Sequence, residues 1–129
     1  MFSTLSPKHL LRPFLTLTLL AASAIAAPNA GKSQAVTGWV LDSACAFTKQ
    51  LEKPISRDCA LACARKGSQL VILQDDGTIY WPIAESTPAA GQNERLLPYA
   101  GKRVTATGKV YARGGSQALV IENLAAASR

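Results

Sequence analysis

Three cysteines are the residues of this chain whose type and spacing could do chemistry. Cys45, Cys59 and Cys63 follow the pattern C-x13-C-x3-C. On a helix, the i, i+4 spacing of Cys59 and Cys63 places both side chains on one face. Cys45 lies in the segment before them and can fold back onto that face. The spacing therefore predicts one cluster of three sulfur atoms.

A structural disulfide is the first chemistry open to this cluster. In an oxidising compartment, a bridge from Cys45 to Cys59 closes a loop of about 15 residues and contributes on the order of 3 kcal/mol in the chain-entropy model. A bridge from Cys45 to Cys63 is about as favourable. A bridge between Cys59 and Cys63 fits less well, because the Cα–Cβ bonds of a helical i, i+4 pair run nearly parallel. One disulfide would leave a third, free thiol.

Metal binding is the second chemistry. Three thiolates that converge from a helix and a loop suit a soft ion such as copper(I), or zinc with Asp42 as a fourth ligand. The pattern lacks the paired C-x-x-C knuckles of a zinc ribbon. A copper site with three sulfur ligands would need no histidine.

Thiol redox chemistry is the third. If a helix begins after Ser56, Cys59 lies in its first turn, where the helix dipole lowers the pKa of a thiol. Cys63 or Cys45 could then resolve an oxidised Cys59. The C-x3-C spacing differs from the C-x-x-C of the usual disulfide oxidoreductases.

The first 26 residues predict a cleaved signal peptide. A segment with Lys8 and Arg12 precedes an apolar run over 14–22, and Ala24-Ile25-Ala26 provides a small-residue cleavage site. We therefore expect a periplasmic or secreted protein with no membrane span after cleavage. The apolar run is shorter than the about 20 residues that cross a bilayer.

Charge and histidine content narrow the function. The chain has a net charge of +6, and loss of two basic residues with the signal peptide leaves +4, spread without a basic run. This balance fits weak affinity for an acidic envelope polymer or a protein better than a nucleic-acid surface. The single histidine, His9, lies within the signal peptide, so Cys–His catalysis, histidine–metal ligation and c-type haem attachment are excluded. We expect a non-enzymatic binding or structural module.

A short helix is expected to hold two of the cysteines. Ser56 is suited to the N-cap, and Asp58 favours the positive end of the helix dipole. The alanine-rich run over 57–66 then ends at Gly67, a residue typical of the position after a helix.

Five strands are predicted around this helix. Asp76-Gly77 and Gly114-Gly115 are hairpin turn signals, with a type I′ turn expected at the first. The expected strands cover 35–41, 69–74, 78–83, 103–111 and 118–124. The order of strands resembles the OB-fold, a small five-stranded barrel, with a cysteine-bearing helical insertion after the first strand. This predicts an all-β domain over 35–124, between a flexible lead-in (27–34) and a tail (125–129).

Aromatic residues offer one further candidate surface. Trp39, Tyr80, Trp81 and Tyr111 could form a stacking platform on the barrel, or could fill and cover its core.

The cysteines belong to a wider motif. Gly38-x-Val40-x-Asp42-x-x-Cys45 is followed by Cys59-x3-Cys63-x3-Gly67. This pattern resembles a group of small exported bacterial proteins that share G-x-V-x-D-x-x-C followed by C-x-x-x-C-x-x-x-G. The resemblance implies a shared fold and a shared role for the cysteines, and it implies no activity.

Overall fold

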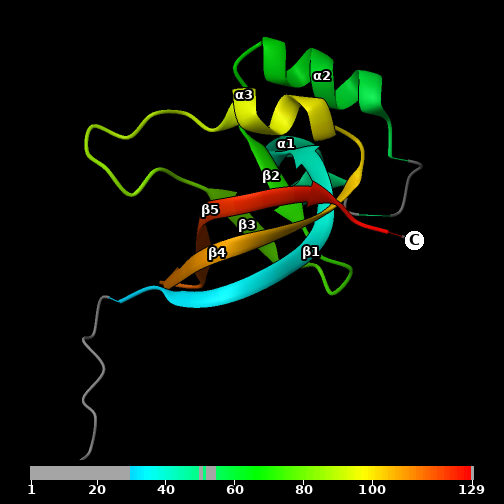
Figure 1. Ribbon diagram of the computed structural model, residues 1–129. Helices are drawn as coiled ribbons and strands as arrows, with labels where there is room; N and C mark the ends of the chain where they lie inside the picture. Colours follow the sequence, from blue (N-terminus) through cyan, green and yellow to red (C-terminus); the bar gives the residue numbers. More distant parts are fainter. Residues whose placement is uncertain (1–29, 50, 52–54, 129) are drawn as a thin grey trace, which may run out of the picture.

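The computed structural model describes residues 30–49, 51 and 55–128. The predicted signal peptide (1–26) lies outside the described residues. No helix among the described residues is long and apolar enough to cross a membrane. In chain order the elements (Figure 1) are β1 (Lys32–Asp42), α1 (Ser43–Thr48), α2 (Arg57–Arg65), β2 (Leu70–Leu73), β3 (Ile79–Pro82), α3 (Asn93–Leu96), the 3-10 helix η1 (Leu97–Tyr99), β4 (Arg103–Arg113) and β5 (Ser116–Ala126).

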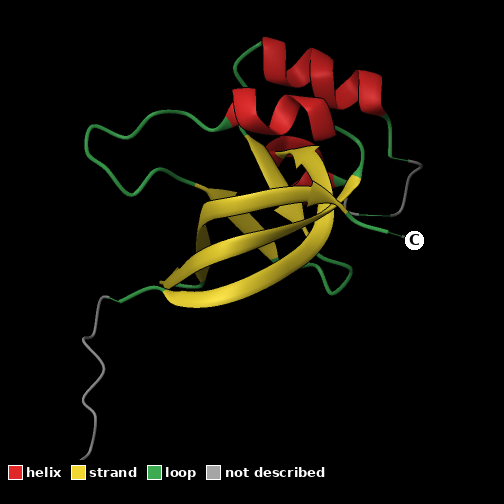
Figure 2. Ribbon diagram, in the orientation of Figure 1, coloured by secondary structure: helices red, strands yellow, loops and turns green. Residues whose placement is uncertain are grey.

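The five strands close into a barrel in the order β1-β2-β3-β5-β4. β3 and β5 pair in parallel, and the other neighbours are antiparallel. The long strand β1 closes the barrel because its residues 32–39 pair with β4 and its residues 39–42 pair with β2. Figure 2 shows the strands in yellow as one curved layer, with the helices gathered at one end. The structure confirms the predicted OB-like barrel and its cysteine-bearing insertion.

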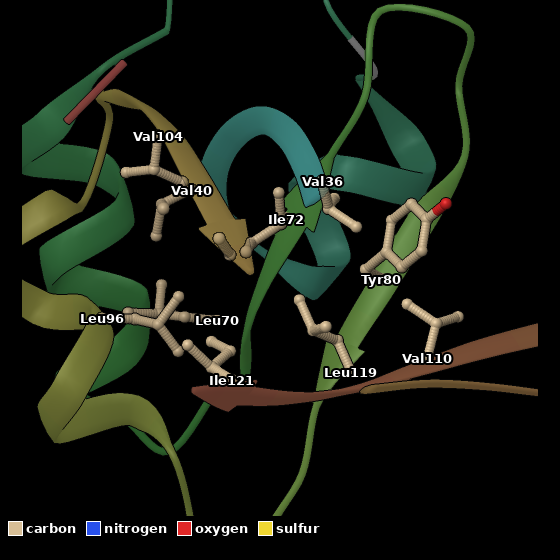
Figure 3. Packing of buried hydrophobic residues seen from close by; sticks show 11 residues of the cluster. Val36, Val40, Leu70, Ile72, Tyr80, Leu96, Val104, Val110, Leu119 and Ile121 are labelled. Carbon is tan, nitrogen blue, oxygen red and sulfur yellow. The ribbon is translucent and has the colours of Figure 1, made fainter. Parts of the chain in front are cut away.

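The strand β2 is buried on both faces. Successive side chains of a strand point to opposite faces of the sheet. Leu70 and Ile72 face the barrel interior, where they join the main core in Figure 3. Val71 and Leu73 face outward, where Ala46 of α1 packs against them in a second cluster. The helical insertion therefore covers the outer face of the sheet and is part of the hydrophobic structure.

The short helix α3 closes one end of the barrel. Leu96 is fully buried against the main core, beside Leu70 and Ile121 in Figure 3. Arg95 fixes the helix to β5, because its guanidinium donates hydrogen bonds to the carbonyl oxygens of Ile121 at 2.6 Å and Glu122 at 2.8 Å. α3 and η1 lie between β3 and β4, where an OB-fold usually carries its helix.

Two glycines allow the close contacts that bend the strands. A Cβ atom at Gly108 would overlap the carbonyl oxygen of Val120, at the point where the β4–β5 register shifts. A Cβ atom at Gly38 would lie 2.5 Å from the carbonyl oxygen of Leu73. Glycine is the one residue that leaves space for the neighbouring backbone at these positions.

Several boundaries differ from those that the sequence predicts. β1 begins at Lys32, three residues before the predicted strand, and β5 ends at Ala126, two residues after it. The first hairpin turn also differs from the predicted type I′ turn. Gly77 donates its amide hydrogen to Gln74 O, and the amide of Gln74 donates to Thr78 O, so the loop has three residues and ends at a glycine with φ of 87°.

Candidate functional site

The end of β1 brings a carboxylate into the protein interior. Asp42 is the N-cap of α1, and its Oδ2 accepts a hydrogen bond from the amide of Cys45 at 3.2 Å. The hydroxyl of Ser68, just before β2, donates to the same oxygen at 3.3 Å. Asp42 is only 2% exposed. Hydrogen bonds are needed here because a buried polar group without a partner is costly.

The helix α1 that follows Asp42 lies in a segment for which we expected irregular structure. Residues 43–48 form a short helix that begins at the Asp42 cap. The position of Asp42 three residues before Cys45 is a recognisable capping signal. Cys45 lies in the first turn of α1, and this places its thiol beside the carboxylate of Asp42.

The helix α2 holds the other two sulfurs and confirms the predicted N-cap. Ser56 Oγ accepts a hydrogen bond from the amide of Cys59 at 3.2 Å. After α2, Gly67 takes a positive φ of 94°, and the amide of Ser68 donates to Cys63 O at 3.1 Å. This C-terminal turn redirects the chain so that Ser68 reaches Asp42.

The thiols of Cys45 and Cys63 are held in their protonated forms. A hydrogen bond to the Asp42 carboxylate is the main reason that the pKa of Cys45 rises to about 12, followed by burial, the charge of Asp42 and interactions with Cys59. Burial is the main reason that the pKa of Cys63 is raised, followed by the charges of Asp42 and Cys59. Because the thiolate is the reactive form of cysteine, this environment makes both thiols weak nucleophiles at neutral pH.

The residues of the cluster differ in their exposure to solvent. The thiols of Cys45 and Cys63 are half-buried, and the pKa of each is raised by the nearby Asp42 and Cys59. Asp42 is buried, whereas Cys59 is exposed to solvent. The structure therefore brings together the four residues that the sequence singled out.

All three cysteines are free thiols in the structure. Within the described part of the chain, no group of three or more Cys, His, Asp or Glu side chains is arranged to hold a metal ion. Asp42, which the sequence suggested as a fourth ligand for zinc, instead accepts hydrogen bonds from the amide of Cys45 and the hydroxyl of Ser68.

The four aromatic candidates do not share one surface. Tyr80 is part of the barrel core, where Gln34 Nε2 donates a hydrogen bond to its hydroxyl at 3.2 Å. Trp39 and Trp81 are half-buried against the outer cluster of β1, β2 and α1. Tyr111 lies outside this cluster, and its hydroxyl donates a hydrogen bond to Glu85 at 2.6 Å.

Phe47 is an exposed aromatic residue that the sequence reasoning did not single out. Its side chain is 60% exposed, and its ring centroid lies 6.0 Å from that of Trp81. The two rings line a groove of about 440 Å³ that extends to the turn at Gly114 and Gly115. The sequence shows that Phe47 lies two residues after Cys45. The direction of its side chain depends on the helix α1, which the sequence did not predict.

The comparisons with known proteins found no matching family model, no matching curated protein and no matching solved structure.

Proposed function

We propose that this chain is an exported, non-enzymatic structural and binding module, in which a disulfide between Cys45 and Cys59 fixes the helical insertion to the barrel. The observation that carries the proposal is the cluster itself. Two half-buried thiols on different helices both contact the exposed Cys59, next to the buried Asp42. The raised pKa values of Cys45 and Cys63 favour a structural role over that of an activated nucleophile.

The pairing follows from the elements that carry the sulfurs. Cys59 and Cys63 lie one turn apart on α2, where their side chains run nearly parallel. Cys45 lies on α1, and its pKa is raised in part by the nearby Cys59. A bridge between these two would link α1 to α2 across the segment between them and stabilise the fold by about 3 kcal/mol in the chain-entropy model. Cys63 would keep its thiol.

The wider motif supports the same role. Gly38 allows β1 to pass close to the backbone of β2, and Gly67 allows the turn that brings the chain from α2 to β2. Asp42 caps α1 beside the cluster. Each of these motif positions thus helps to place the cysteines, which fits the resemblance to small exported bacterial proteins with the same pattern.

The test is thiol counting on protein purified from the periplasm of an expression host. Under denaturing conditions we expect one free thiol per chain and an intact mass lower than that of the reduced protein by two hydrogens. Metal analysis of the same sample should find no bound copper or zinc. Three reactive thiols would contradict the proposal, and three thiols with stoichiometric metal would instead establish a soft-metal site.

The binding role is proposed for the groove beside Phe47 and Trp81. The positive charge of the chain favours an acidic envelope polymer as the partner. Titration of the protein with a purified anionic cell-wall polymer should change the tryptophan fluorescence, because Trp81 lines the groove. Phe47→Ala should weaken this response. A fluorescence response that Phe47→Ala leaves unchanged, or no response at all, would rule out this groove as the binding surface.

A further inference from the structure

The three cysteines differ in solvent accessibility, and a Cys45–Cys59 disulfide alone does not explain this difference. Cys59 is exposed in the first turn of α2, whereas Cys45 and Cys63 are half-buried, and the amide of Cys45 is hydrogen-bonded to the buried Asp42. An external reagent therefore meets the sulfur of Cys59 first. Accessibility and thiolate content together decide which cysteine of a group reacts with a disulfide.

We propose that Cys59 is a modification site at which a small-molecule disulfide enters the cluster, and that Asp42 delays closure of the Cys45–Cys59 bridge. This inference rests on the proposed function. It adds the order of the two steps and a defined intermediate, the mixed disulfide on Cys59.

The first step is an exchange at the exposed sulfur. The thiolate of Cys59 attacks one sulfur of the external disulfide, so that a bond forms between Cys59 Sγ and that sulfur. The external sulfur–sulfur bond breaks, and the second external sulfur leaves as a thiolate that takes up a proton. The product carries one small thiol on Cys59 and still has the thiols of Cys45 and Cys63.

The second step closes the bridge. The sulfur of Cys45 loses its proton and attacks Cys59 Sγ, and the bound small thiol leaves and takes up a proton. Two protein thiols have then been oxidised, and the external disulfide has been reduced to two thiols. Because the carboxylate of Asp42 holds the Cys45 thiol in its protonated form, the second step is slow and the mixed disulfide persists.

The size of the delay follows from the environment of Cys45. A pKa raised from 9.0 to about 12 lowers the thiolate fraction at neutral pH by about a thousandfold. The higher nucleophilicity of a more basic thiolate recovers part of this loss, with a Brønsted coefficient of about 0.4–0.5. Cys45 is then expected to attack about 30- to 60-fold more slowly than a thiol with the ordinary pKa.

The experiment uses the reduced protein and glutathione disulfide as the probe. Samples quenched with acid at successive times are measured by intact mass, which separates the reduced, glutathionylated and bridged forms. We expect the glutathionylated form to rise first and the bridged form to follow. Proteolysis of the intermediate should place glutathione on Cys59. In the double variant Cys45→Ser/Cys63→Ser, the mixed disulfide should accumulate and stay.

Two further variants and one control variant separate this inference from the proposed function. Cys59→Ser should react with glutathione disulfide at least 10-fold more slowly than the wild type. Asp42→Asn should shorten the life of the intermediate, whereas Asp58→Asn, which removes a carboxylate from the exposed first turn of α2, should not. If the bridge forms but glutathione appears first on Cys45 or Cys63, the order is wrong and the bridge stands. If no bridged form appears, both proposals fail. Thermal melting of each variant establishes that it is folded.

Discussion

Replacement of Asp42 by Asn tests the electrostatics of the cluster most sharply. Asparagine is as good an N-cap as aspartate, and its amide oxygen can accept the hydrogen bonds from the Cys45 amide and the Ser68 hydroxyl. The substitution therefore removes the negative charge and keeps the shape and the cap. We expect the fold to persist and the pKa of Cys45 to fall.

The magnitude follows from the causes of the raised pKa. The carboxylate contributes the largest and the third-largest effects on the Cys45 thiol, and burial and Cys59 account for the rest. If half of the increase from 9.0 to about 12 is lost, the rate of attack at neutral pH rises about 6- to 8-fold, and if all of it is lost the rate rises about 30- to 60-fold. The predicted acceleration lies between these values.

The assay measures alkylation of Cys45 alone. In the background Cys59→Ser/Cys63→Ser, the second-order rate with iodoacetamide is followed across pH, with and without Asp42→Asn. We expect the midpoint of the rate profile to move to lower pH in the asparagine variant. Asp58→Asn in the same background is the matched control and should leave the profile in place. An unchanged or slower rate in a folded Asp42→Asn protein would refute the role assigned to the carboxylate.

Three further predictions concern stability. Leu96→Ala removes the side chain that closes one end of the barrel core and should lower the free energy of unfolding by about 2–5 kcal/mol in urea denaturation; a loss below 1 kcal/mol would show that Leu96 does not seal the core. Gly108→Ala should cost about 1–3 kcal/mol because its Cβ overlaps the backbone of Val120, whereas Gly91→Ala, with no atom within 4 Å, should change the melting temperature little. Equal effects of the two glycine substitutions would contradict the packing argument. In the reduced protein, the raised pKa of Cys45 means that this thiol binds its proton more tightly in the folded state than in the unfolded state. The resulting contribution to the free energy of unfolding is present below pH 9 and is lost between pH 9 and about 12. Melting temperatures across this range should fall less steeply for Cys45→Ser, and parallel curves would disprove the contribution.

Local signals made part of this structure predictable. Ser56 and Gly67 are the residue types that begin and end helices, and the structure confirms a helix between them. The glycine pair at 114 and 115 predicted the hairpin between β4 and β5. These features depend on residues that are neighbours in the sequence, so they can be predicted from the sequence alone.

Other features depend on contacts between distant segments. Residues 32–34 are polar and give no strand signal, yet they extend β1 because they pair with β4. The outer faces of Val71 and Leu73 are buried only because α1 covers them. No local pattern contains this information.

The sequence predicted which residues make up the candidate site, but not the environment of its thiols. The i, i+4 spacing and the preceding loop brought Cys45, Cys59 and Cys63 together with Asp42, as expected. The sequence reasoning did not anticipate that burial and a buried carboxylate raise the pKa values of Cys45 and Cys63. The burial of Asp42 follows from the packing of Ser68 and two helices around it, which spacing alone does not show.

Digestion with trypsin tests the proposed disulfide between Cys45 and Cys59 most directly. Cleavage after Lys32, Lys49, Arg57 and Arg65 places Cys45 in peptide 33–49, and both other cysteines in peptide 58–65. After free thiols are alkylated, a digest without reduction of the protein purified from the periplasm of an expression host should contain these two peptides joined, and fragmentation should show Cys45 linked to Cys59, with the alkyl group on Cys63. Two separate peptides, or a link from Cys45 to Cys63, would contradict the account.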